Sequence, residues 1–255
     1  MCIVTFAWQS HPRWKLIAIG NRDEMHARPA APLSRWDNPA HLLAGRDTKA
    51  GGTWLGVSEE GRFAVVTNLS GYGAPDSGKS SRGDLLKDFL SGEGSYSDFS
   101  VSEFEDFNPF NLITISGDQA LIHSNQPEPV SGALTADIYD LSNGPLERPW
   151  PKSGTLKMSL KTWMNGSAEN PEHLLNALQD ETPYFPQGEA ENYAKDDLAR
   201  HPQYSPIFIR NPVYGTRCST VVVIDHEGDG LIIERRFASS AEITGQTALT
   251  FSWPV

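Results

Sequence analysis

The chain is built from pairs of apolar runs separated by short polar turns. Residues 1–8 (MCIVTFAW) and 14–21 (WKLIAIGN) form the first pair, with QSHPR between them. Further strand candidates are residues 52–68, 111–124, 219–237 and 248–253. The turns EEG, GDQ and HEGD inside these segments are typical of β-hairpins, in which consecutive strands run antiparallel. The pattern therefore predicts antiparallel sheets.

Helical segments fall between the hairpins. Residues 80–92 follow a serine cap and end at a glycine, residues 152–166 carry an apolar stripe, and residues 170–181 begin with the helix-starting pair Asn-Pro. The Pro- and Tyr-rich residues 182–208 are interpreted as a surface excursion and a candidate lid. Because no repeat or break in composition divides the chain, we expect a single α+β domain over residues 1–255.

The charge of the chain narrows the classes of partner. A net charge of −11 argues against nucleic acid and against anionic membrane surfaces, since both need a basic face. There is no apolar run long enough to span a bilayer, and the start of the chain lacks the pattern of a signal peptide. Two cysteines provide no disulfide framework. We expect a cytoplasmic protein that binds a small molecule, without nucleic acid and without membrane insertion.

Residues 73–80 (GAPDSGKS) match the phosphate-binding pattern G-x-x-x-x-G-K-[ST]. A P-loop connects a parallel strand to a crossover helix, whereas the strands of this chain come in hairpins. Pro75 also lacks one of the N–H groups on which such a loop depends, and Gly83 disfavours a helix that starts at the lysine by about 1 kcal/mol. We interpret residues 73–80 as a polar surface loop with Lys79 exposed.

Cys2 directly follows the initiator methionine. Methionine is usually removed when the next side chain is small, and Cys2 would then carry both a thiol and a free α-amine. Such a residue is a nucleophile with its own base. The simpler alternative is a small apolar residue that begins a strand.

The pairing of the first hairpin determines what lies beside Cys2. If Trp8 pairs with Trp14, Cys2 faces Gly20, and Arg22 follows on the same face. A shift by one residue would bring Asn21 and Asp23 to that face instead. An arginine beside a thiol favours the thiolate, and an aspartate beside an α-amine orients it. In either register, the NRD segment lies next to the start of the chain.

Four polar clusters interrupt or end the apolar strands: GNRDE (20–24), VVTN (65–68), LSNGP (141–145) and YGTR (214–217). Each of them alone is compatible with an ordinary strand end or turn. Together with MC, AGGTWLGV, SRG, FNL and PLERPWPK, in order over nearly the whole chain, they resemble the NRDE-motif family, also called the transport and Golgi organisation protein 2 family.

More distantly, the same landmarks resemble the choloylglycine hydrolases, which include bile-salt hydrolases and penicillin V acylases. This resemblance implies an N-terminal nucleophile hydrolase-like four-layer αββα sandwich with two mostly antiparallel sheets. It also implies six catalytic residues: Cys2, Arg22, Asp23, Asn68, Asn143 and Arg217.

The implied roles follow from those hydrolases. Cys2 corresponds to the nucleophile, and its α-amine to the general base. Arg22 and Asp23 correspond to the pair beside it, although the hydrolases space these residues three apart and here they are adjacent. Asn68 and Asn143 would hold the oxyanion. Arg217 matches the late arginine that supports the nucleophile, whereas its neighbour Cys218 is expected in the core.

The implied activity is hydrolysis of non-peptide C–N bonds in linear acyl amides, and we assign no cofactor and no metal ligand. The alternative, by the same family analogy, is a non-catalytic carrier of an amphipathic ligand such as haem or a lipid or acyl group. A haem carrier needs an axial ligand, for which His11, His26, His41 and Cys2 are candidates. These histidines lack paired ligand spacing.

Overall fold

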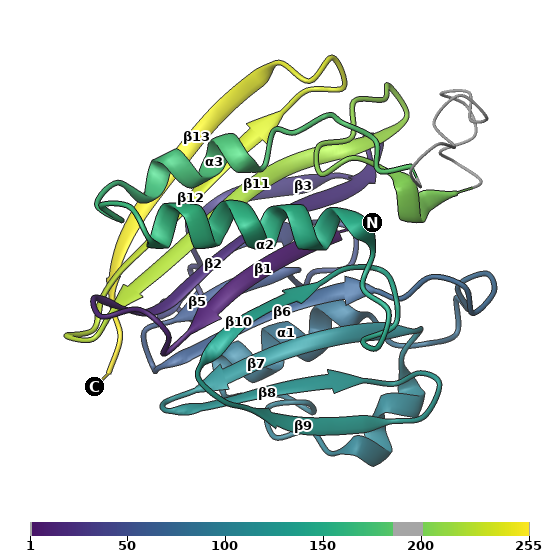
Figure 1. The fold of residues 1–255 in the computed structure, drawn as a ribbon. Helices are drawn as coiled ribbons and strands as arrows, with labels where there is room; N and C mark the ends of the chain where they lie inside the picture. Colours follow the sequence, from purple (N-terminus) through teal and green to yellow (C-terminus); the bar gives the residue numbers. More distant parts are fainter. Residues whose placement is uncertain (1, 186–200, 255) are drawn as a thin grey trace.

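The computed structural model describes residues 2–185 and 201–254 (Figure 1). Within this part of the chain, a six-stranded sheet has the order β10 (Asp137–Leu141), β1 (Cys2–Trp8), β2 (Trp14–Met25), β11 (Tyr214–Asp225), β12 (Asp229–Phe237), β13 (Ile243–Ser252). A seven-stranded sheet has the order β3 (Ala30–Arg35), β4 (Leu42–Asp47), β5 (Leu55–Ser58), β6 (Arg62–Asn68), β7 (Phe110–Ser116), β8 (Gln119–Ser124), β9 (Val130–Leu134). All neighbouring strands in both sheets pair antiparallel.

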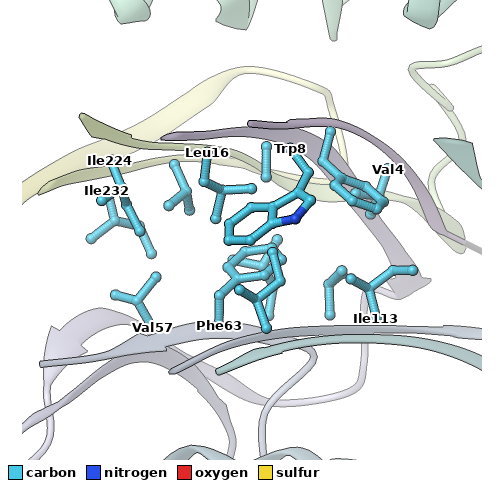
Figure 2. Close-up of a cluster of buried hydrophobic side chains, with 14 of the residues drawn as sticks. Val4, Trp8, Leu16, Val57, Phe63, Ile113, Ile224 and Ile232 are labelled. Carbon is cyan, nitrogen blue, oxygen red and sulfur yellow. The ribbon is translucent and has the colours of Figure 1, made fainter. Parts of the chain in front are cut away.

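The two sheets stack face to face around a shared apolar core. Figure 2 shows side chains from the six-stranded sheet, among them Trp8 and Leu16, pointing toward Val57, Phe63 and Ile113 of the other sheet. All five of these side chains are buried. Alternation along each strand supplies this face, since every second side chain points toward the other sheet. Phe63 is completely buried, so truncation to alanine would cost about 3–5 kcal/mol of stability.

Helices cover the outer face of each sheet (Figure 1). The helix α2 (Pro151–Met164) and the short α3 (Leu174–Ala177), which follows a 3-10 turn at Pro171–His173, pack on the six-stranded sheet. The helix α1 (Arg82–Ser91) and a 3-10 helix at Val101–Asp106 pack on the seven-stranded sheet. This four-layer αββα arrangement confirms the predicted fold class. None of the described helices is long and apolar enough to cross a membrane.

The helix boundaries largely agree with the sequence signals. Ser81 caps α1 by accepting a hydrogen bond from the Gly83 N–H group, and Gly92 ends the helix in the left-handed conformation at φ 72°. The segment predicted at 170–181 has the expected Asn170 cap but is helical only as far as Ala177. The candidate lid at 182–208 lies partly outside the described residues.

Four strands, β3, β4, β9 and β10, are absent from the sequence-based prediction. None of them is longer than six residues, and three of the four form sheet edges. Pro32, Gly45 and Gly132 interrupt their apolar patterns. Edge strands tolerate such residues because one side of the backbone needs no partner.

The first hairpin has neither of the two registers considered from the sequence, and it is shifted by two residues from the Trp8–Trp14 pairing. Trp8 lies opposite Leu16, not Trp14, and Cys2 therefore lies opposite Arg22. The turn closes through a hydrogen bond from the Gln9 N–H to the Lys15 carbonyl oxygen, which agrees with this register. Because a shift of two residues preserves the side-chain faces, Arg22 still shares the face of Cys2.

The loop at residues 73–80 is not a P-loop. It follows an antiparallel strand, and α1 begins at Arg82 instead of at the lysine. Lys79 is exposed, as predicted, but its Nζ donates to the carbonyl oxygens of Glu105 (3.0 Å) and Phe107 (3.4 Å). This loop nevertheless lies beside the candidate functional site described below.

Candidate functional site

Cys2 stands at the start of β1, on the wall of a cavity of about 570 Å³. The cavity lies where the ends of β1, β2, β4 and β6 meet the loop that leads into α1. Cys2 is half-buried, so its thiol belongs neither to the core nor to a fully exposed surface. Antiparallel pairing with β2 on one side and β10 on the other fixes the strand that carries it.

The side chain of Asn143 holds the main chain of Cys2. The Cys2 nitrogen donates to Asn143 Oδ1 at 2.8 Å, and Asn143 Nδ2 donates to the Asn68 carbonyl oxygen at 2.6 Å. Asn143 is completely buried. The second N–H of its Nδ2 has no acceptor among the described residues, which leaves one donor for a bound group.

Buried hydrogen bonds fix the loop that carries Asn143. Thr67 Oγ1 donates to the Ser142 carbonyl oxygen at 2.8 Å, and Asn111 Nδ2 donates to the Gly144 carbonyl oxygen at 2.9 Å. Both donors come from the seven-stranded sheet, while the loop follows β10 of the other sheet. The position of Asn143 therefore depends on the stacking of the two sheets.

Arg22 faces the same inter-sheet side as Cys2, and its guanidinium is enclosed. Its Nη2 donates to Asp47 Oδ2 at 3.3 Å, and the guanidinium carbon lies 4.3 Å from the centre of the Trp54 ring. Asp47 also accepts from Arg28 Nε at 2.5 Å. Burial by itself would raise the pKa of Asp47, but these bonds and that from the Ala50 N–H outweigh it and lower the pKa. Asp47 thus stays ionised and aligns both arginines.

Asp23 points to the other face of β2, toward α2. It is buried and accepts a hydrogen bond from Thr216 Oγ1 at 2.6 Å. Burial raises its pKa, an effect opposed by the positive charge of Lys152. Lys152 itself is completely buried and donates to Ser205 Oγ at 3.0 Å. Burial lowers the pKa of Lys152, and the negative charges of Asp23 and Cys2 oppose that shift.

The structure brings together five of the six predicted site residues. Cys2, Arg22 and Asn68 line the cavity, and Asn143 forms hydrogen bonds with Cys2 and Asn68. Asp23 also borders the cavity, although its carboxylate bonds to Thr216 on the other face of β2. Arg217 is placed differently from the expectation. It lies in a bulge of β11, and its Nη1 donates to the carbonyl oxygens of Met25 (2.9 Å) and Arg28 (3.0 Å). It holds the turn after β2 and does not line the cavity.

Sequence reasoning missed several residues of the site. Asp47, Trp54 and Arg82 line the cavity, and the buried Lys152 interacts electrostatically with Asp23. Trp54, Arg82 and Lys152 fall inside the quoted segments AGGTWLGV, SRG and PLERPWPK, so a signal was present. Their roles depend on contacts across the fold, which a single sequence does not reveal.

The remaining candidates lie apart from the cavity. His11 Nδ1 accepts from the Trp14 N–H, while the Nε2 atoms of His26 and His41 bond to backbone carbonyl oxygens. Cys218 is buried, as expected, and burial raises the pKa of its thiol well above the ordinary range. In the described part of the chain, no group of three or more His, Cys, Asp or Glu residues could hold a metal ion.

The sequence as a whole identifies the family. Residues 1–239 match the model of the family described as Transport and Golgi organisation 2. The chain belongs to this family. A Transport and Golgi organization protein 2 homolog from Homo sapiens is 33% identical over 261 residues and a Mus musculus homolog is 32% identical over 260, each alignment covering 92% of both chains. The resemblance inferred from the short motifs is confirmed.

Solved structures show where the fold of this Transport and Golgi organisation 2 family member occurs elsewhere. A Caenorhabditis elegans ortholog of N-acylethanolamine-hydrolyzing acid amidase is similar with a TM-score of 0.51 at 12% identity, covering 87% of this chain and 92% of that one. Penicillin V acylase from Agrobacterium tumefaciens is similar with a TM-score of 0.51 at 13% sequence identity. The match covers 96% of this chain and 90% of the acylase chain. At such identities the similarity shows the fold alone, which is that of the N-terminal nucleophile hydrolases.

Proposed function

We propose that this protein is a cysteine amidohydrolase that cleaves the C–N bond of linear, non-peptide acyl amides. The observation that carries the proposal is the 2.8 Å hydrogen bond between the Cys2 nitrogen and the buried Asn143 side chain, at the wall of an accessible cavity. This bond holds the nitrogen that would become the α-amine beside the thiol and next to a buried side-chain amide.

The reaction requires removal of Met1, after which the Cys2 nitrogen is a free α-amine. That amine takes the proton of the Cys2 thiol, and the thiolate attacks the amide carbon to give a tetrahedral oxyanion. The C–N bond then breaks, and the leaving amine takes the proton from the α-ammonium group. Water attacks the resulting thioester while the α-amine accepts its proton, which releases the acid and restores the thiol.

The surrounding residues have separate tasks in this scheme. Asn143 orients the α-amine through Oδ1 and offers its second Nδ2 N–H to the oxyanion, together with the exposed side chain of Asn68. Arg22 adds positive charge on the face of the thiolate. Asp23, with its partner Thr216, supports the strand end beneath the amine. Arg217 holds the turn after β2 in place through its hydrogen bonds to the backbone of Met25 and Arg28.

Two measurements test the proposal. Intact mass of the purified native protein should show loss of Met1, and a panel of acyl amides should be hydrolysed by the wild type but not by Cys2→Ala. Retention of Met1, or hydrolysis by the Cys2→Ala variant, would contradict the mechanism. Tight binding of hemin or a lipid by both proteins without turnover would instead support the carrier alternative.

A further inference from the structure

The cavity at Cys2 is lined by more cationic than acidic residues, although the chain as a whole is acidic. Its lining includes five cationic residues, Arg22, Arg28, Lys49, Lys79 and Arg82, against four carboxylates, Asp23, Glu24, Asp47 and Asp76, although the net charge of the whole chain is −11. Few apolar residues line it, the largest being Trp54. A cavity of this kind suits a polar, negatively charged ligand better than a long apolar chain.

Among the described residues, three of these cations form no ion pair. Among the cavity carboxylates, Asp47 pairs with Arg22 and Arg28, and Glu24 also pairs with Arg28. Asp23 accepts from Thr216 Oγ1 on the other face of β2, and Asp76 accepts from the Gly78 N–H. In residues 2–185 and 201–254, Lys49, Lys79 and Arg82 form no ion pair with a carboxylate. Cationic groups that line a cavity beside a reactive residue and form no ion pair are available to an anion.

Arg82 is the best placed of these groups. It is half-buried at the first position of α1, and its Nη1 donates to the Pro109 carbonyl oxygen at 2.9 Å, which fixes the guanidinium against the wall. Burial lowers its pKa, and Arg82 and Cys2 line the same cavity. The guanidinium remains charged at any pH at which the protein is folded.

Arg22 adds an independent observation. Its side chain is only 5% exposed, and its Nη1 is buried without any hydrogen-bond acceptor. A buried guanidinium nitrogen without a partner is costly, and an acceptor supplied by a ligand would relieve that cost. Since Arg22 lines the cavity beside Cys2, such an acceptor would lie within the same cavity as Arg82.

We propose that Arg82, with Arg22 and Lys79, forms a carboxylate subsite, and that the acyl amides cleaved at Cys2 are small and carry a carboxylate. This inference rests on the proposed function for the identity of the reaction. The subsite itself is a property of the cavity and does not depend on turnover.

The test compares two alkylating reagents of nearly equal size at Cys2, anionic iodoacetate and neutral iodoacetamide. In wild type, the ratio of the iodoacetate rate to the iodoacetamide rate should exceed that of a free thiol about tenfold. Arg82→Gln should lower the ratio toward the free-thiol value, Arg82→Lys should keep part of it, and high salt should reduce it. Lys161→Gln, an exposed cation on α2, should leave it unchanged.

A second measurement uses protection of Cys2. Glutarate should slow alkylation by iodoacetamide in wild type but not in Arg82→Gln, whereas neutral glutaramide should protect neither. A ratio that is insensitive to Arg82, or a Cys2 that reacts with neither reagent, would overturn the subsite. An amide panel that fails while the iodoacetate preference persists would overturn only the hydrolase.

Discussion

Asn143 Oδ1 accepts a hydrogen bond from the Cys2 main-chain nitrogen at 2.8 Å, although 141 positions separate the two residues. The same side chain donates to the Asn68 carbonyl oxygen. One buried amide thus connects the start of β1, the end of β6 and the loop after β10. It makes the geometry around Cys2 a property of both sheets together.

Replacing Asn143 by alanine should therefore affect stability as well as activity. Asn143→Ala leaves the Cys2 nitrogen and the Asn68 oxygen without their partner, which should cost about 1–3 kcal/mol. At roughly 2–4 °C per kcal/mol for a protein of this size, the Tm should fall by several degrees. Thermal unfolding followed by circular dichroism measures this. Asn165→Ala, at an exposed position, should have little effect, and equal Tm losses for the two variants would contradict the bridging role.

Arg22 should control the reactivity of the Cys2 thiol. Arg22→Ala removes the positive charge opposite Cys2 and should slow alkylation by iodoacetamide on the order of three- to tenfold, while Arg22→Lys should retain part of the rate. Mass spectrometry of the N-terminal peptide gives the rates, with circular dichroism to verify folding. A rate that ignores Arg22 would remove the electrostatic basis of the nucleophile.

Cys218 should not react with thiol reagents in the native protein. It is 4% exposed, and both burial and the neighbouring Glu234 raise the pKa of its thiol. In Cys2→Ser, a thiol reagent should find no reactive group until guanidinium chloride unfolds the chain, when one thiol should appear. Fast native labelling of this variant would mean that the inter-sheet core opens readily.

Glu234 should make stability depend on pH. Burial raises its pKa above the value of 4.5 in the unfolded chain, so the folded state holds the proton more tightly. The folded state then binds more protons than the unfolded state between the two pKa values, and stability should fall as pH rises through that window. Urea unfolding at a series of pH values should show this slope, and Glu234→Gln should flatten it. The exposed Glu169→Gln should not, and identical slopes in all three proteins would refute the assignment.

The sequence alone determined the main hairpins and the helix that follows β6. The apolar runs around Gly61, Gly117 and Gly228 predicted three of the hairpins, because these turns place a glycine at positive φ where other residues are strained. The Ser81 cap and Gly92 end predicted α1 for the same kind of local reason. These features depend on neighbours along the chain, which the sequence displays directly.

Only the tertiary structure decided how the site is assembled. Local pattern left the register of Cys2 open, and it could not show which of Arg22 and Asp23 shares the face of Cys2. The contacts of Arg217 with Met25 and Arg28, and the burial of Lys152 beneath Asp23, join segments more than a hundred residues apart. Such contacts arise because two sheets and their helices must share one set of buried polar partners, and the identity of each partner is fixed only when the layers pack.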